Sequence, residues 1–458
     1  MKFFSKPVEE HSEVPLADDG RWEAIVAHWT RREAPQRGPA PNGNACHVLA
    51  VHRSGDRGDP SAQLAEITSL VESQGDHIVG AEVHELHRPD PRTLIRSGVA
   101  ARIGAEARVR GADLLVIDAE LSPSQTRNLE DATGLPIADR EAVILNVFAR
   151  HATTPRARAQ VELAHLEYLR PRIRGIGLDM DQQAGGVMGS RGSGDSASEL
   201  LARTLDDRLV ELRRRLAQIS AADSERRRRR TGAFRVALVG YTNAGKTSLM
   251  NALCDAGLSA RDRPFETLDT TTRCLTRHGG DVLLSDTVGF IRRLPDRLFA
   301  SFASTLAEIS EASLLLVVVD GSDPEVEEHL RLIETVLARL GAAALPRLVV
   351  FNKNDRVTAV RSAGELARLA GVHDRVCLSA HDSDATASLR ATILAAARAR
   401  HAVRELFVPY ERGELASRIY AQCLVLQTHA TARGTQFLIE GSPSVVEKLA
   451  HACRKRTA

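Results

Sequence analysis

The residues whose types and spacing suit chemistry form one glycine-containing segment in the middle of the chain. They follow the pattern GxxxxGKT and are Gly240, Tyr241, Thr242, Asn243, Ala244, Gly245, Lys246 and Thr247. An apolar run at residues 236–239 comes before them, and Ser248 opens a helical pattern that continues to residue 253. A loop between a strand and a helix presents backbone N–H groups and the positive end of the helix to phosphates. We therefore predict that this segment binds a nucleoside triphosphate, and that Lys246 neutralises its β- and γ-phosphates.

A second segment carries groups suited to a metal ion and to the terminal phosphate. Asp286, Thr287 and Gly289 follow a predicted strand at residues 282–284. An aspartate at a strand end can hold Mg²⁺ through water, and a glycine amide can bond the γ-phosphate. We expect this segment to sense hydrolysis. The hydroxyl of Thr247 is the expected direct ligand of Mg²⁺.

One more threonine would complete the coordination of Mg²⁺. We assign that part to Thr267, in the segment that begins at Phe265. The neighbouring Thr270, Thr271 and Thr272 are close alternatives. These threonines have a simpler explanation than metal binding, because threonine is frequent in strands and this segment is a candidate edge strand.

Recognition of the base is expected from two loops that each follow an apolar run. The residues are Asn352, Lys353, Asp355, Ser379 and Ala380. A carboxylate at Asp355 can accept hydrogen bonds from N1–H and from the exocyclic amine of guanine. Adenine lacks that pair of donors and would leave the carboxylate unpaired, so guanine is favoured. A backbone amide in the loop of Ser379 and Ala380 is expected to bond the guanine oxygen.

Two positions bear on the rate of hydrolysis. Phe290 follows Gly289 where Ras-like switches carry a glutamine that orients water, so we predict slow intrinsic hydrolysis assisted by a partner or an ion. Asn243 is suited to hold K⁺ beside the β- and γ-phosphates. The alternative is that its side chain only braces the loop, and the sequence favours neither.

The composition is that of a soluble globular protein with several cores. The chain has 458 residues, of which 43% are hydrophobic and 26% are charged, which suits three or four folded units. We find no apolar run long enough to span a bilayer and no signal-peptide core, so we expect a cytoplasmic protein, which we also expect to be a monomer. The 6 cysteines are scattered without a CxxC pair, which suits reduced thiols.

The pattern of apolar residues divides the chain into five parts, and the predicted fold class is α/β. We expect a disordered tail over residues 1–44 and a small parallel α/β sheet over residues 45–155. Residues 156–230 form a helical hairpin with a glycine-rich loop and a basic second helix. The nucleotide domain covers residues 233–400, and residues 401–458 have two candidate strands and two helices, enough for a small α+β domain.

The hairpin has a leucine pattern and a strongly basic second helix. The seam positions are Leu205, Leu209, Leu212, Leu216 and Ile219, alternating four and three residues apart as in a coiled coil. Pro171 is expected to end the first helix. The arginines, which include the run at residues 226–230, suit a polyanionic partner. Their alternative explanation is a solvated helix face that leads into a charged linker.

With these motifs placed, the chain resembles the HflX family, a translation-associated branch of the TRAFAC GTPases. The resemblance rests on ELSPSQTRNLE at residues 120–130, on Asp139 and Arg140, on GYTNAGKTSLMNAL at residues 240–253 and on DTVGFI at residues 286–291. It implies an amino-terminal α/β and hairpin domain, a GTPase domain and a small carboxyl-terminal domain. It also implies binding to the large ribosomal subunit and GTP-dependent splitting of stalled ribosomes.

The chain departs from the family in the parts that would face the ribosome. Gly192, Ser193, Gly194 and Asp195 stand where the family's hairpin loop has a GPGE core, and His381 stands where lysine is commoner. These differences suggest a divergent paralogue. The leading hypothesis is a GTPase stimulated on the large subunit. The alternatives are a GTP-loaded RNA- or ribosome-binding adaptor with little turnover, and an RNA-modification or assembly GTPase.

Overall fold

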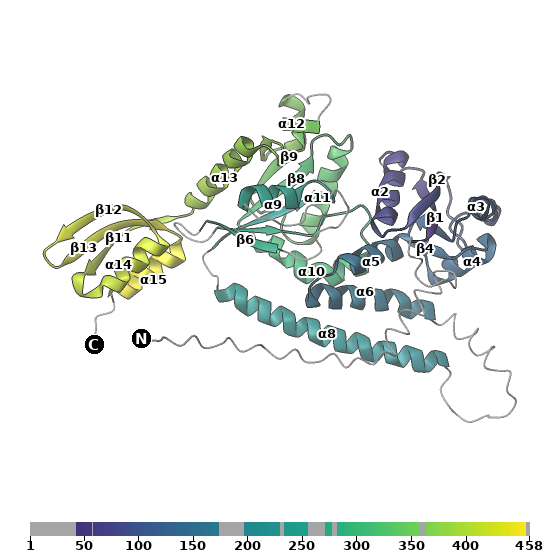
Figure 1. The fold of residues 1–458 in the computed structure, drawn as a ribbon, viewed down its shortest axis with the longest axis horizontal. Coiled ribbons are helices and arrows are strands. Elements are labelled where there is room, and N and C mark those ends of the chain that lie inside the picture. The colour runs from purple at the N-terminus through teal and green to yellow at the C-terminus, as the bar shows by residue number, and fades with distance from the viewer. Residues whose placement is uncertain are drawn as a thin grey trace, which may run out of the picture.

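The structure is a computed structural model that describes residues 43–56, 58–173, 197–229, 233–254, 271–276, 282–356 and 363–454. Three sheets follow one another along the chain. In Figure 1 the amino-terminal sheet and the carboxyl-terminal sheet lie on opposite sides of the central sheet. Residues 1–42, where the tail was predicted, and residues 174–196, which hold the glycine-rich loop, lie outside the described residues.

The amino-terminal sheet is parallel and has the strand order β2-β1-β3-β4. Its strands are β1 (Ala45–Arg53), β2 (His77–Leu86), β3 (Leu114–Asp118) and β4 (Ile137–Asp139). The connecting helices are α2 (Pro60–Ser73), α3 (Ser97–Val109) and α4 (Pro123–Thr133), and α5 (Arg140–His151) follows β4. β3 is buried along its whole length, and its apolar residues 114–117 are typical of a strand covered on both faces.

A pair of long helices follows this sheet. Helix α6 (Pro155–Ile173) packs on α8 (Ala197–Arg229) through buried side chains that include Leu163 and Leu209. The leucine seam predicted from the sequence is therefore the contact between the helices, although Ile219 lies outside this cluster. The expectation that Pro171 ends the first helix is wrong, because α6 continues to Ile173. Pro171 lacks the N–H that would bond the Glu167 carbonyl, so α6 loses one hydrogen bond close to its end.

The central sheet has six strands in the order β10-β9-β8-β5-β7-β6. They are β5 (Phe234–Gly240), β6 (Thr271–Thr276), β7 (Val282–Asp286), β8 (Leu314–Asp320), β9 (Arg347–Asn352) and β10 (Asp374–Cys377). Helices α9 (Lys246–Cys254), α10 (Asp296–Ser310), α11 (Val326–Arg339), α12 (Ala363–Ala370) and α13 (Ser383–Arg398) accompany them. β6 runs antiparallel to β7 at the edge of the sheet. From the sequence, an edge strand was named here only as the alternative explanation for Thr271 and Thr272.

The last unit is an antiparallel sheet in the order β11-β13-β12 with two helices. Its strands are β11 (Ala402–Pro409), β12 (Leu424–Thr431) and β13 (Gly434–Gly441), and its helices are α14 (Gly413–Gln422) and α15 (Pro443–Arg454). The prediction of two strands was incomplete because it lacked β11. Buried residues of both helices, β11 and β13 form one core, against which Val425 of β12 packs.

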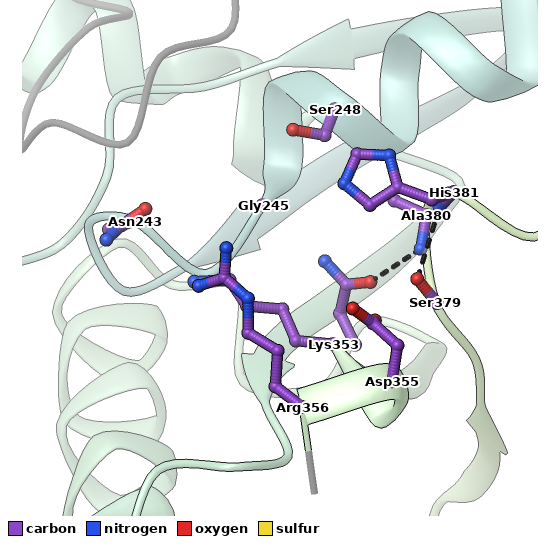
Figure 2. A pocket seen from close by; sticks show the side chains of 10 residues that line it. Asn243, Gly245, Ser248, Lys353, Asp355, Arg356, Ser379, Ala380 and His381 are labelled. Atoms are coloured by element: carbon purple, nitrogen blue, oxygen red, sulfur yellow. Dashed lines mark hydrogen bonds between the residues drawn. The ribbon is translucent and has the colours of Figure 1, made fainter.

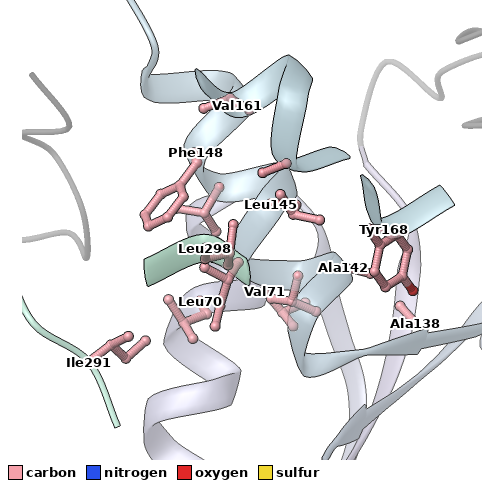
Figure 3. Close-up of a cluster of buried hydrophobic side chains, with 14 of the residues drawn as sticks. Leu70, Val71, Ala138, Ala142, Leu145, Phe148, Val161, Tyr168, Ile291 and Leu298 are labelled. Carbon is pink, nitrogen blue, oxygen red and sulfur yellow. The ribbon is translucent and has the colours of Figure 1, made fainter. Parts of the chain in front are cut away.

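One hydrophobic core joins the amino-terminal sheet and the helix pair to the central unit. It combines residues such as Val71 and Phe148 with Val288, Ile291, Leu298 and Phe302 from the central unit. Figure 3 shows Leu298 among side chains of the amino-terminal unit. Phe148 and Phe302 make an edge-to-face contact with ring centroids 4.9 Å apart. Among the described helices none is long and apolar enough to cross a membrane.

Candidate nucleotide-binding site

The phosphate loop connects β5 to α9 in the predicted way, and two of its glycines are required by close contacts. A Cβ on Gly240 would clash with the backbone oxygen of Val318 in the neighbouring strand β8. Gly245 has φ +90, and a Cβ there would clash with the Asn352 side chain. Asn243 has φ 61, a left-handed conformation that asparagine adopts more readily than most residues.

Lys246 is buried beneath this loop. Its ammonium group donates hydrogen bonds to the backbone oxygens of Tyr241 at 2.8 Å and Gly240 at 3.2 Å. Burial lowers the pKa of Lys246 to about 8, and the nearby Asp286 carboxylate opposes this shift. An anionic phosphate at this position would stabilise the charged form of the lysine.

Two of the three predicted magnesium ligands, Thr247 and Asp286, lie in contact with each other. Thr247 Oγ1 donates a hydrogen bond of 2.7 Å to Asp286 Oδ2. A hydroxyl and a carboxylate beside a phosphate loop are the hard oxygen donors that Mg²⁺ prefers, and the ion usually keeps several waters and phosphate oxygens as its other ligands. Among the described residues no group of three or more His, Cys, Asp or Glu could hold a metal ion by itself. The donor set therefore fits Mg²⁺ that arrives with a nucleotide.

The segment after Asp286 lies directly on the phosphate loop. Thr287 is buried and bonds the backbone oxygen of Leu238 at 2.6 Å, so its hydroxyl braces β5. The Phe290 N–H donates to Gly240 O at 2.9 Å, and the Phe290 oxygen accepts from the Thr242 N–H at 2.8 Å. The Phe290 ring is buried in the core and offers no group that could orient water.

A cavity of about 200 Å³ marks the expected base site (Figure 2). Its lining residues are Asn243, Gly245, Ser248, Asn352, Lys353, Asp355, Arg356, Ser379, Ala380 and His381. The structure thus brings the phosphate loop and both predicted base loops to one cavity. Arg356 and His381 were not assigned to the site by sequence reasoning. Arg356 belongs to no motif that the sequence analysis used. His381 was named there only as a difference from the family, in which lysine is commoner at this position.

Asn352 and Asp355 have different parts in this cavity. The buried Asn352 donates to Ala244 O at 2.9 Å and accepts from the Ala380 N–H at 3.0 Å, so it joins the phosphate loop to the second base loop. A backbone amide of this loop was expected to bond guanine, and the amide of Ala380 is engaged by Asn352 instead. Asp355 lies at the cavity, and a hydrogen bond from Ser379 lowers its pKa, which keeps the carboxylate ionised.

Other predicted residues lie apart from the cavity or outside the described part. Phe265, Thr267 and Thr270 are outside the described residues. Thr271 and Thr272 belong to β6, where Thr272 and Ser285 share a hydrogen bond of 2.9 Å between their hydroxyls. The Tyr241 side chain points away from the phosphate loop. Its hydroxyl donates a hydrogen bond to Glu66 of α2, and its ring stacks on the ring of His329 with the ring centroids 3.8 Å apart.

Comparison with known proteins gives three family models in consecutive order. The model "GTP-binding GTPase N-terminal" matches residues 61–149, and "GTP-binding GTPase Middle Region" matches residues 151–230. The model "50S ribosome-binding GTPase" matches residues 235–353. Together with the phosphate loop, the fold defines a P-loop GTPase with an amino-terminal and a middle region.

Whole-length relatives narrow this class to one family. GTPase HflX of Spirochaeta thermophila is 38% identical over 404 residues, which are 88% of this chain and 97% of the relative. GTPase HflX of Gluconacetobacter diazotrophicus is 37% identical over 433 residues, covering 86% and 94%. A GTP-binding protein from Sulfolobus solfataricus, crystallised with GDP, matches with 23% identity and a TM-score of 0.42 over 77% of this chain and 98% of that one. The chain belongs to the HflX family of GTPases, as the resemblance predicted, and its enzyme class is GTP hydrolase.

Proposed function

We propose that this protein hydrolyses Mg²⁺-bound GTP, binds the large ribosomal subunit and splits or rescues stalled ribosomes, acting as a cytoplasmic monomer. The observation that carries the proposal is the match of residues 235–353 to a family described as 50S ribosome-binding GTPase. The single cavity that unites the phosphate loop with Asp355 supports the nucleotide part of the proposal. The slow intrinsic rate follows from Phe290, which is buried and apolar.

Each residue of the site has a proposed part in binding or hydrolysis. Lys246 neutralises charge on the β- and γ-phosphates, and the Gly289 amide bonds the γ-phosphate. Thr247, Asp286 and Thr267 hold Mg²⁺, which when bound offsets negative charge on the phosphate oxygens. Asp355 selects guanine, while Asn352 fixes the two loops between which the base lies.

The docking surface is proposed to lie in the amino-terminal parts, residues 45–155 and 156–230. On α8, Arg208 and Arg213 form ion pairs of 2.7 Å with Glu162 and Glu167 of α6, so they stabilise the hairpin. Arg214 is exposed and suits contact with RNA phosphates. In this proposal residues 1–44 are a tail, residues 233–400 the GTPase domain and residues 401–458 a small carboxyl-terminal domain.

Turnover with and without purified large subunits tests the proposal. We expect GTP hydrolysis to rise on the order of tenfold or more with subunits, as stimulated GTPases do. R214A should reduce this stimulation and leave the basal rate unchanged. R331A, at another exposed arginine on α11, is the matched control and should do neither. An unchanged rate with subunits would overturn ribosome-coupled hydrolysis.

A GTP-loaded adaptor with little turnover is the second candidate, and the buried Phe290 favours it. A single-turnover assay with ribosomes present separates the two candidates. An adaptor would keep its GTP after binding the ribosome, whereas a coupled GTPase would release phosphate. Crosslinking of α8 to cellular RNA would identify the RNA bound by an assembly factor.

A further inference from the structure

The second base loop, which follows β10, uses its backbone amides for bonds inside the protein. The Ala380 N–H donates to Asn352 Oδ1 at 3.0 Å. The His381 N–H donates to Ser379 Oγ at 3.3 Å, and the Asp382 N–H donates to the backbone oxygen of Ser379 at 3.0 Å. A bond from any of these amides to the oxygen at C6 of guanine would therefore compete with a bond that the protein already makes.

Three side chains at the base cavity are engaged in the same way. Lys353 Nζ forms an ion pair of 2.9 Å with Asp320 Oδ2, so its ammonium group is held at the end of β8. The Ser379 hydroxyl donates a hydrogen bond to Asp355, and the Asn352 amide nitrogen donates one of 2.9 Å to the phosphate loop. Among the described residues of the two base loops, the other side-chain donors that line the cavity belong to Arg356 and His381.

Arg356 and His381 approach the cavity from different sides. Arg356 ends the short helix η1 (Asn354–Arg356), and Figure 2 shows its side chain extending toward the phosphate loop. The His381 ring lies instead on the side of the cavity where Ser379 and Ala380 stand (Figure 2). Arg356 is therefore directed toward the place of the phosphates, whereas His381 lies beside the loops that would receive the base.

Hydrogen bonds fix the backbone of His381 beside the carboxylate that is proposed to bind guanine. Ser379 Oγ donates to Asp355 and accepts from the His381 N–H, so one hydroxyl links the two residues. On the other side of His381, Asp382 caps α13 and accepts hydrogen bonds from two backbone amides of its first turn. The bond from Ser379 is the main cause of the lowered pKa of Asp355, and His381 adds to this shift electrostatically. The imidazole therefore lies near the Asp355 carboxylate.

The arrangement of polar groups on guanine matches this placement. The oxygen at C6 is bonded to the carbon next to N1, so a group that binds this oxygen must lie beside the group that accepts from N1–H. An imidazole ring carries an N–H in both of its charge states, so it can donate to that oxygen in either. His381 is exposed, so its ring can turn toward a bound base.

We infer that the His381 side chain donates a hydrogen bond to the C6 oxygen of guanine and is a specificity-determining residue of the base cavity. The inference rests on the proposed function, in which this cavity binds a guanine nucleotide. Asp355 recognises N1–H and the exocyclic amine, whereas His381 recognises the oxygen. A nucleotide with a weaker acceptor at C6 loses affinity through His381, and a nucleotide without the exocyclic amine loses affinity through Asp355.

Three nucleotides that differ in one group of the base test this inference in the full-length protein. They are GDP, 6-thio-GDP, in which sulfur replaces the oxygen as a weaker acceptor, and IDP, which lacks only the exocyclic amine. H381A removes the donor, and H381Q keeps an N–H donor on a side chain of similar reach. H429A, at an exposed histidine of β12, is the matched control, and R356A tests the other donor at the cavity. Calorimetry at one pH measures each dissociation constant.

We expect H381A to weaken GDP binding on the order of tenfold and 6-thio-GDP binding much less, so that the preference for GDP over 6-thio-GDP shrinks. The preference for GDP over IDP should stay the same in H381A, because Asp355 is intact. H381Q, R356A and H429A should keep both preferences. This pattern would show that the N–H donor of His381 acts on the oxygen and not on the base as a whole.

Other patterns would overturn the inference. Equal weakening of all three nucleotides in H381A would mean that His381 only supports the loop, and an equal loss of preference in H381Q and H381A would mean that the N–H donor is not the reader. An unchanged preference for GDP over 6-thio-GDP in H381A would leave the Ala380 amide or Arg356 as the reader, and R356A separates these two. If the wild-type protein bound none of the three nucleotides, the proposed function itself would be wrong.

Discussion

Thr247 Oγ1 donates a hydrogen bond of 2.7 Å to Asp286 Oδ2, which ties the first turn of α9 to the end of β7. Asp286 is fully buried, so its carboxylate depends on such partners in the folded protein. The two oxygens that would hold Mg²⁺ directly and through water are thus adjacent before any ligand is considered. This contact makes the metal site testable with conservative changes.

D286N is expected to raise the Mg²⁺ concentration needed for tight GTP binding on the order of tenfold, because the amide keeps the shape but removes the charge that attracts the ion. Titration of Mg²⁺ at fixed fluorescent GTP analogue measures the effect. S285A is the matched control, since Ser285 precedes Asp286 in β7 and bonds Thr272 instead. Equal Mg²⁺ requirements for D286N and S285A would refute the assignment.

D355N is expected to change the nucleotide preference of the protein from guanine to xanthine nucleotides. The carboxylate accepts two hydrogen bonds from guanine, whereas an amide would donate one to the second oxygen of xanthine and leave a guanine donor unpaired. We expect GTP affinity to fall on the order of a hundredfold or more while affinity for the xanthine nucleotide rises. Competition binding with both nucleotides measures this, and D374N at the exposed start of β10 is the control. Retained GTP preference in D355N would show that another group reads the base.

The nucleotide site was more predictable from the sequence than the contact between the units. The strand–loop–helix order around residues 240–247 is local, so the pattern contains the information for its own geometry. Glu66 and Arg140 lie 74 residues apart, and their ion pair depends on the arrangement of the whole parallel sheet. Nothing around Tyr241 indicates that its side chain turns toward α2. Such long-range polar contacts have no periodic or local signal in a single sequence.

The strands that sequence analysis lacked share a physical reason. β6 and β11 both pair antiparallel with their neighbours, and an antiparallel strand with one exposed face alternates instead of forming a continuous apolar run. β8 and β9 are covered on both faces and contain continuous apolar runs at residues 314–319 and 348–351. The apolar pattern therefore indicates a strand that is covered on both faces better than one with an exposed face.

Nucleotide affinity is expected to depend on pH through Lys246. Burial lowers its pKa to about 8 in the nucleotide-free protein, and a bound phosphate stabilises the charged form and raises that pKa. Affinity should therefore be level below about pH 8 and fall about tenfold per pH unit above it until the pKa of the complex is reached. Equilibrium binding of fluorescent GDP from about pH 7 to about pH 9 measures the slope. In K246R the guanidinium stays charged throughout, so any residual binding should lose this slope. A pH-independent affinity in the wild-type protein would mean that Lys246 keeps its charge when nucleotide-free.

GTP turnover is expected to be faster in KCl than in NaCl if Asn243 holds K⁺ beside the β- and γ-phosphates. Its side chain lines the nucleotide cavity, where an ion ligand and a brace for the loop remain the two alternatives. N243G preserves the left-handed backbone, since glycine adopts φ 61 without strain, and removes only the ligand. We expect N243G to retain GDP binding within a few-fold and to lose the difference between the two salts. S248A, also at the cavity, is the control and should keep the preference for K⁺. Equal rates of the wild-type protein in both salts would remove K⁺ from the mechanism, and a large loss of GDP binding in N243G would show that Asn243 braces the loop after all.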